Sequence, residues 1–193
     1  PLLNKHFADW QAASTGRLDK TIASVPARSE TAVYLIDRPN SPQTVIMAGQ
    51  LFPPTGSEDN LQIEAMNEIF GGSFTSRINM NLREDKGWAY GAFSFMQNAK
   101  GQRPWLVYAP VQTDKTAESI AEIQRELDAY LQQNPATAEE LEKVVNNNTN
   151  SLPGQYETAR AVLGALVNNN VYDRPQDYVE TLASRYRALE LDA

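Results

Sequence analysis

The stretch that decides the fold runs from Asn67 to Ser94 and reads NEIFGGSFTSRINMNLREDKGWAYGAFS. Apolar residues of 3.6-residue period precede Gly71-Gly72, which predicts a helix that ends at these two glycines. A second helix is predicted over Ser73–Asp85, with the Ser73 hydroxyl as its N-cap and an apolar face formed by Phe74, Ile78 and Leu82. Gly87 ends this helix, and an aromatic-rich strand is predicted to follow it without a long loop.

Strands and helices flank this stretch on both sides. Four strands are predicted from β-branched and aromatic residues bounded by turn residues, over residues 32–37, 43–52, 88–97 and 104–112. Four helical segments are predicted after Thr113, and one of them opens with the capping-box pair Thr137 and Glu140. The order β-β-α-α-β-β-α-α-α-α predicts the α+β class, an antiparallel-rich mixed sheet with helices packed mainly on one face.

The ionisable residues exclude several classes of protein. The 193 residues include 17 Lys and Arg against 24 Asp and Glu, a net charge of −7 without a basic block, which argues against nucleic acid as a partner. With His6 as the one histidine and no cysteine, the sequence cannot supply a paired-His or thiolate metal site or a thiol nucleophile. No run of about 18 apolar residues is present, so we expect no membrane span.

Arg83 and Tyr90 are the residues in this stretch best suited to chemistry. Arg83 falls in the last turn of the predicted second helix, and Tyr90 falls near the start of the following strand. Across a tight turn at Gly87 the two side chains can reach one point, where they would form a donor pair for an oxyanion or a peptide carbonyl. The alternative is that Arg83 is a solvated partner of the helix dipole and that Tyr90 is half core and half surface.

The stretch Asn67–Ser94 resembles the C-terminal, non-zinc-binding domain of the pitrilysin/insulinase/mitochondrial processing peptidase family of zinc peptidases. The resemblance rests on the G-G pair, the S-R pair and the R-x6-Y spacing together, and weaker agreement covers most of the chain. It implies an α+β domain that faces a zinc-bearing half, in the same polypeptide or in a separate subunit. That half carries the zinc ligands in an H-x-x-E-H motif, so this chain would bind no cofactor and zinc would lie in the partner.

The resemblance also assigns roles by motif position. Arg83 and Tyr90 would bind a peptide substrate and polarise its carbonyl at the zinc site of the other half, and the isolated chain would be inactive. Bacterial relatives favour the periplasm, although the residues themselves do not show the compartment. We divide the chain into a linker segment over residues 1–28 and the domain over residues 29–193. Similar domains continue into a further helix and strand, so the domain is expected to be truncated at its C-terminal end, with one strand position open.

Two other functions are compatible with parts of the sequence. A scaffold or assembly subunit of the same fold would need neither donor, and an H-x-x-E-H motif upstream or in a neighbouring chain would argue against it. An unrelated enzyme with paired carboxylates would have to use the adjacent acids Glu58 and Asp59, or Glu84 and Asp85, with acid groups about 5 to 10 Å apart. Adjacent acids at helix ends are more often caps and surface charges.

Overall fold

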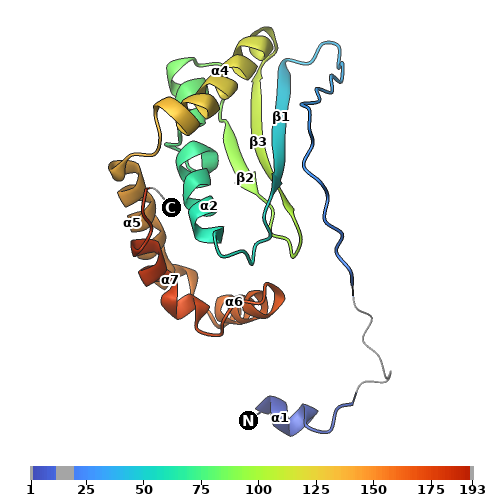
Figure 1. Ribbon diagram of the computed structural model, residues 1–193, viewed down its shortest axis with the longest axis vertical. Helices are drawn as coiled ribbons and strands as arrows, with labels where there is room; N and C mark the ends of the chain where they lie inside the picture. Colours follow the sequence, from blue (N-terminus) through green and yellow to red (C-terminus); the bar gives the residue numbers. More distant parts are fainter. Residues whose placement is uncertain (1, 12–19, 192–193) are drawn as a thin grey trace.

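A computed structural model describes residues 2–11 and 20–191 of the chain (Figure 1). In it, a small sheet is flanked by a series of helices. The helices and strands are α1 Leu2–Phe7, β1 Gln43–Phe52, α2 Asn60–Asn67, α3 Arg77–Asn79, β2 Phe93–Met96, β3 Arg103–Gln112, α4 Thr116–Asp128, α5 Ala138–Gln155, α6 Ala159–Val171 and α7 Tyr178–Arg187. Short π-helical or 3-10 turns extend several of them: η1 Glu68–Gly72, η2 Met80–Asp85, η3 Thr113–Lys115 and η4 Ala129–Gln133.

The sheet has the strand order β1-β3-β2, and both strand pairs are antiparallel. Gln43 lies opposite Gln112 at one end of the β1–β3 ladder, and Phe93 lies opposite Tyr108 in the β2–β3 ladder. The predicted strand 43–52 is therefore confirmed. The strands predicted over residues 88–97 and 104–112 form an antiparallel pair, although the first of them is limited to Phe93–Met96. Figure 1 shows α2 and α4 on the same side of the sheet, which agrees with the predicted α+β class with helices mainly on one face.

The core forms between this sheet face and the helices. Side chains of β3 alternate between buried and half-buried positions, as expected for a strand covered on one face. The main cluster of buried residues includes Phe70, Ile78, Leu82, Trp105, Val107, Val111, Ile123 and Val144. A smaller cluster joins α2 to α7 through Leu61, Tyr178, Leu182 and Tyr186. On the opposite sheet face Val45, Met47, Phe93 and Phe95 are exposed.

The predicted strand 32–37 does not form. This segment has no assigned strand, and its side chains Val33 to Ile36 are 78–90% exposed. Its composition favours a strand, but β-propensity reflects the fit of a side chain to a half-buried pleated surface. No neighbouring strand supplies that surface here, because β1 pairs only with β3 among the described residues.

Helix boundaries differ from the predictions where tertiary contacts decide them. The second helix begins after Ser76, whose backbone is extended, and not after Ser73. Pro153 lies inside α5, which ends at Gln155, although a proline usually interrupts a helix. The capping box of Thr137 and Glu140 is confirmed, because each side chain bonds the backbone N–H of the other residue. None of the helices in the described ranges is long and apolar enough to cross a membrane.

The two ends of the stretch Asn67–Ser94 are bonded to each other. The Ser94 hydroxyl donates to Asn67 Oδ1 over 2.7 Å, and the Trp105 indole N–H donates to the same oxygen over 2.8 Å. Gly71 fits closely beneath this contact, since a Cβ there would lie 2.4 Å from Ser94 Oγ and 2.6 Å from the Ser94 backbone nitrogen. The first glycine of the G-G pair is therefore required for close packing of η1 on β2.

Gly71→Ala is expected to lower the free energy of unfolding by about 1 to 3 kcal/mol, because the added methyl group overpacks a backbone contact. Urea unfolding followed by circular dichroism measures the change. Gly164→Ala in α6 is the matched control, since nothing lies within 4 Å of the position that its Cβ would take. That control is expected to be neutral or stabilising by up to about 1 kcal/mol. Equal effects of the two substitutions would contradict the packing argument.

Candidate functional site

Arg83 lies in the π-helical turn η2, one residue after the buried Leu82. In this turn the Lys86 N–H donates to the Asn81 carbonyl over 3.0 Å, which is the i→i+5 bond of a π-helix. Such turns are frequent at functional sites. The widened turn leaves Arg83 half-buried at the edge of the helix, with its Nε 3.3 Å from Glu84 Oε1.

Gly87 turns the chain from η2 toward Tyr90. Its φ of +65° lies in the left-handed region, and nothing lies within 4 Å of a Cβ at this position, so the backbone torsion alone favours glycine. After the turn, the Trp88 carbonyl accepts the Gln112 N–H over 2.9 Å, and Ala89 forms a bridge with Val111. Tyr90 is thereby fixed next to the end of β3, and its side chain is 87% exposed.

The structure brings the two predicted site residues into contact. Arg83 Cζ lies 5.5 Å from the centroid of the Tyr90 ring, within the range of a cation–π contact. Among the hydrogen bonds of the described residues none involves the Tyr90 hydroxyl, so this donor faces solvent. The guanidinium and the phenol therefore form a joint donor surface, and their role in catalysis stays a prediction.

Phe74 is a third member of this site that the sequence prediction missed. Its periodicity with Ile78 and Leu82 placed it in the core, but its side chain is 57% exposed. The ring instead contacts Arg83, with Cζ 4.3 Å from the ring centroid. The G-G-x-F part of the motif was the available signal, because an aromatic residue two positions after a glycine break need not belong to the face of the next helix.

Arg77, the other arginine of the motif, has a structural role. Its guanidinium forms a bidentate pair with Glu140 at 2.8 and 2.6 Å and donates to the carbonyls of Asn134 and Pro135. Its Cζ also lies 4.7 Å from the Tyr130 ring centroid. The hydrogen bond from Arg77 is the main cause that lowers the pKa of Glu140, and burial raises the pKa of Tyr130 to about 12. Four of its five N–H groups are engaged in these bonds within the fold, so Arg77 acts mainly as a scaffold residue.

The acid pairs considered for carboxylate chemistry are exposed. Glu58 and Asp59 lie in the turn ahead of α2, and Glu84 is paired with Arg83. Asp85 lines an open groove with Glu126 and Glu140, whose carboxylates are already bonded to arginine or asparagine. Over residues 2–11 and 20–191 no group of three or more His, Asp or Glu side chains could hold a metal ion. The described residues therefore do not fit a zinc site.

Glu122 of α4 supports the turn that carries Arg83. It accepts from Asn81 Nδ2 over 2.8 Å and lies 3.6 Å from Lys86 Nζ, so it attaches both ends of η2 to α4. Arg125 reinforces this carboxylate at 2.5 Å. The hydrogen bonds from Arg125 and Asn81 lower the pKa of Glu122 to about 2. Glu122 is therefore ionised throughout the range in which the protein would work.

Acid is expected to weaken the fold through Glu122. Its pKa is lower in the folded chain than the unfolded value of about 4.3, so the unfolded state binds a proton first as the pH falls. The stabilisation is complete above pH of about 4.3 and decreases steadily as the pH falls to about 2. Urea unfolding between pH 2 and 6 measures this slope. Glu122→Gln should reduce the slope, whereas Glu142→Gln, at an exposed position of α5, should not. An unchanged slope in Glu122→Gln would contradict the assignment.

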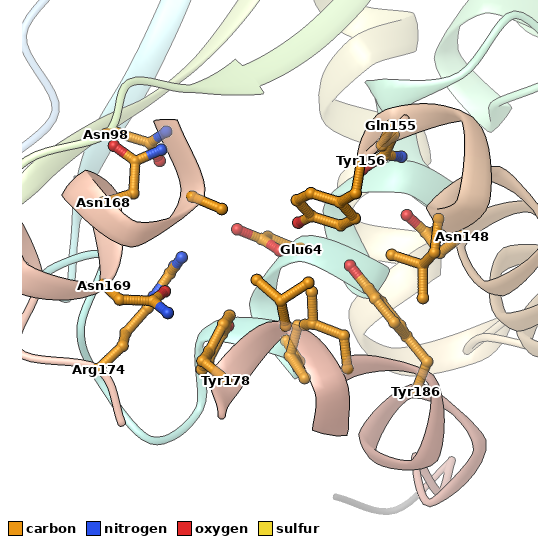
Figure 2. A pocket seen from close by; sticks show the side chains of 15 residues that line it. Glu64, Asn98, Asn148, Gln155, Tyr156, Asn168, Asn169, Arg174, Tyr178 and Tyr186 are labelled. Atoms are coloured by element: carbon orange, nitrogen blue, oxygen red, sulfur yellow. The ribbon is translucent and has the colours of Figure 1, made fainter. Parts of the chain in front are cut away.

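A cavity of about 180 Å³ lies between α2, α5, α6 and α7 (Figure 2). Figure 2 shows the Glu64 side chain near its centre, with labelled asparagine, glutamine and tyrosine side chains around it. Arg174 at its edge stacks on Tyr178, with Cζ 4.3 Å from the ring centroid, and burial raises the pKa of Tyr186 well above its usual range. None of the residues that line it belongs to the segment from Phe74 to Tyr90. The cavity is therefore distinct from the Arg83 and Tyr90 surface.

Comparison with known proteins identifies the family. Residues 1–148, more than half of the chain, match the family model described as the peptidase M16 inactive domain. The chain belongs to the peptidase M16 inactive domain family. This confirms the resemblance to the non-zinc-binding domain of these zinc peptidases, which the motif Asn67–Ser94 indicated.

Similar proteins agree with membership of the M16 inactive domain family. The uncharacterized zinc protease YmxG of Bacillus subtilis (strain 168) is 23% identical over 137 residues, which is 71% of this chain and 33% of that protein. A solved peptidase M16 inactive domain from Pseudomonas fluorescens has a TM-score of 0.70 at 24% identity, over 79% of this chain and 36% of that chain. A protease from Helicobacter pylori has a TM-score of 0.85 at 18% identity, over 99% of this chain and 46% of that chain.

The M16 inactive domain described here spans only part of each of these relatives. Its share of their length ranges from 33% to 46%. The two solved structures are less than 25% identical to this chain, so their similarity is evidence for its fold alone.

Proposed function

We propose that this M16 inactive domain is the substrate-binding half of a two-part zinc metallopeptidase that hydrolyses peptides. In this proposal Arg83 and Tyr90 bind the substrate peptide and polarise its carbonyl at the zinc site of the other half. The zinc-bearing half, with its H-x-x-E-H motif, is contributed by the same polypeptide or by a separate subunit. When bound there, zinc would supply an activated water for attack on the peptide carbonyl.

The observation that carries this proposal is the contact between Arg83 and Tyr90 on an exposed surface inside the family motif. Arg83 Cζ lies 5.5 Å from the Tyr90 ring centroid, and among the described residues neither the terminal nitrogens of Arg83 nor the Tyr90 hydroxyl has a hydrogen-bond partner. Donors fixed in this way stabilise the negative charge that develops on a carbonyl oxygen during attack, and need no rearrangement to do so. A guanidinium can also hold a carbonyl or carboxylate with two N–H groups at once.

In this proposal the chemistry needs both halves, because the described residues of this chain offer neither a metal-binding group nor a cysteine thiol. The isolated domain is therefore expected to show no zinc-dependent proteolysis. It is expected to add activity only when the zinc-bearing half faces it. Tight stoichiometric zinc binding by the isolated domain would contradict this division of labour.

Tyr90→Phe is expected to lower the turnover number of the full-length protein by about 10²-fold, the usual cost of losing one donor to a developing oxyanion. The substitution retains the ring that contacts Arg83 and removes only the exposed hydroxyl, so the fold and the position of Arg83 should be preserved. Hydrolysis of a quenched fluorescent peptide measures the effect. Tyr34→Phe, at an exposed position outside the site, is the control and should leave turnover unchanged.

A scaffold or assembly subunit is the alternative function. The fold alone does not distinguish it from a peptidase half, and the described residues contain no feature that favours it. It predicts that neither Arg83 nor Tyr90 affects any peptidase activity of the full-length protein. The substitutions above therefore separate the two functions directly.

A further inference from the structure

The Arg83 guanidinium contacts two exposed aromatic rings, those of Phe74 and Tyr90. Phe74 is 57% exposed, yet its ring centroid lies 4.3 Å from Arg83 Cζ, closer than the Tyr90 ring at 5.5 Å. A ring with this exposure is not held in place by the core. Its position follows from its backbone and from its contact with the guanidinium.

A single buried amide connects the two segments that carry these rings. Asn79 is fully buried, its Nδ2 donates to the Phe74 carbonyl over 2.6 Å, and its Oδ1 accepts the Ala92 N–H over 3.0 Å. Phe74 lies ahead of α3, and Ala92 follows Tyr90 by two residues. The Asn79 side chain therefore fixes the distance between the backbone at Phe74 (the Phe74 segment) and the backbone at Ala92, two residues after Tyr90 (the Tyr90 segment).

Asparagine is well suited to this bridge, because its amide presents a donor and an acceptor side by side. Aspartate would retain the acceptor for Ala92 but could not donate to Phe74 when ionised. An aliphatic residue would leave both a buried N–H and a buried carbonyl without partners. The bridge is thus specific to the chemistry of the side chain and does not depend on its volume alone.

The remaining contact of Arg83 completes the orientation of its guanidinium. Nε lies 3.3 Å from Glu84 Oε1, and the two rings contact the group through its carbon. Among the described residues no hydrogen bond or ion pair uses the terminal nitrogens of Arg83. The terminal nitrogens are therefore the part of the group that is left to meet an incoming acceptor.

We propose that Phe74 and Asn79 are positioning residues for Arg83: Asn79 sets the spacing of the two aromatic segments, and Phe74 supplies the ring against which the guanidinium is held. Arginine has several rotatable bonds, and an unheld side chain loses much of its freedom when it binds a substrate. Holding it in advance directs the terminal N–H groups before the peptide arrives. This inference rests on the proposed function of Arg83, but its structural part can be tested without activity.

The kinetic test uses the full-length protein with its zinc-bearing half and a quenched fluorescent peptide. Phe74→Leu is expected to lower kcat roughly 2- to 30-fold, the range of one cation–π contact, with KM changed by less than about twofold. Phe74→Tyr should restore kcat to within about twofold of the wild type. Phe7→Leu, an exposed phenylalanine in α1, is the matched control and should leave kcat unchanged.

A second comparison separates positioning from direct contact of Phe74 with the substrate. In an Arg83→Ala background, Phe74→Leu should change kcat by less than about twofold, because no guanidinium remains to be positioned. An undiminished effect of Phe74→Leu in that background would overturn the proposal. If Arg83→Ala lowers turnover but Phe74→Leu does not, the positioning role fails while the proposed function stands. If Arg83→Ala itself has no effect, the proposed function of Arg83 fails, and the positioning role fails with it.

A spectroscopic readout tests the geometry independently of activity. In the ¹⁵N-labelled chain, the Arg83 Nε–H resonance, identified by its absence in Arg83→Ala, should be shifted by the nearby rings. Phe74→Leu and Asn79→Asp should move it toward the position of a free arginine, and Phe74→Tyr should not. If the resonance does not move in Phe74→Leu, the positioning role of Phe74 is overturned. If it does not move in a folded Asn79→Asp variant, the positioning role of Asn79 is overturned. Should Asn79→Asp not fold, the two Phe74 variants decide.

Discussion

Replacing Arg83 by alanine is expected to lower peptide turnover by the full-length protein by about 10² to 10³-fold. The guanidinium is the only positively charged group in contact with Tyr90 among the described residues, and its terminal nitrogens are not engaged by other side chains. Removing it takes away both the charge and the paired N–H groups that would meet the substrate carbonyl. Because this interaction strengthens as charge develops, kcat should fall more than KM rises.

Three comparisons make this result decisive. Arg83→Lys keeps the charge but loses the planar fork, so it should recover only part of the turnover. Arg160→Ala, at an exposed position of α6, should leave turnover unchanged. Circular dichroism should show that all variants are folded, because Arg83 is not part of the core. Unchanged turnover in both Arg83→Ala and Tyr90→Phe would refute the proposed role and favour the scaffold function.

Arg77→Ala is expected to lower the free energy of unfolding by about 2 to 4 kcal/mol. Loss of one partner of a well-buried ion pair costs about 3 to 5 kcal/mol, and this pair is somewhat more accessible. The side chain of Arg77 is 11% exposed, and its removal leaves the Asn134 and Pro135 carbonyls and the Glu140 carboxylate without their main donor. These groups join η4 to the start of α5, so the loss should loosen the connection between α3 and the C-terminal helices.

Urea unfolding measures this change, and thermal unfolding should show a decrease in Tm of about 4 to 16 °C for a chain of this size. Arg125→Ala is the matched control. Arg125 also pairs with two carboxylates, Glu122 and Glu126, but its side chain is 56% exposed. Its loss should cost only about 0 to 1 kcal/mol, as for other surface ion pairs. If the two substitutions had equal effects, burial of the Arg77 pair would not be the cause.

Local sequence signals predicted the parts of the fold that depend on neighbouring residues. Strand β1 was predicted over the same residues as it occupies, and the capping box of Thr137 and Glu140 forms as predicted. These features depend on alternation, turn residues and side-chain bonds within three or four positions of each other. The strand predicted over residues 32–37 failed because a strand also needs a partner, and composition does not provide one.

The candidate site, like the fold, could be predicted only where it depends on residues that are close in the sequence. The spacing of Arg83 and Tyr90 across Gly87 placed them near one point, and the structure brings them into contact. Phe74 was assigned to the core because its spacing from Ile78 matches a helix, but the helix begins only after Ser76. The different roles of Arg77 and Arg83 could not be predicted either, since the partners of Arg77 lie 57 to 63 residues further along the chain.

By itself the sequence determined the class of fold, the family and the position of the donor pair within its motif. The class of fold follows from periodicity and from the two glycine breaks, and the family follows from the resemblance of the motif Asn67–Ser94 to known peptidases. All of these signals are local in the sequence. The tertiary structure alone decided which arginine is bound within the scaffold and which has terminal N–H groups without a partner among the described residues. It also decided that Asn79 joins the Phe74 and Tyr90 segments, because contacts between distant segments depend on how the helices pack on the sheet.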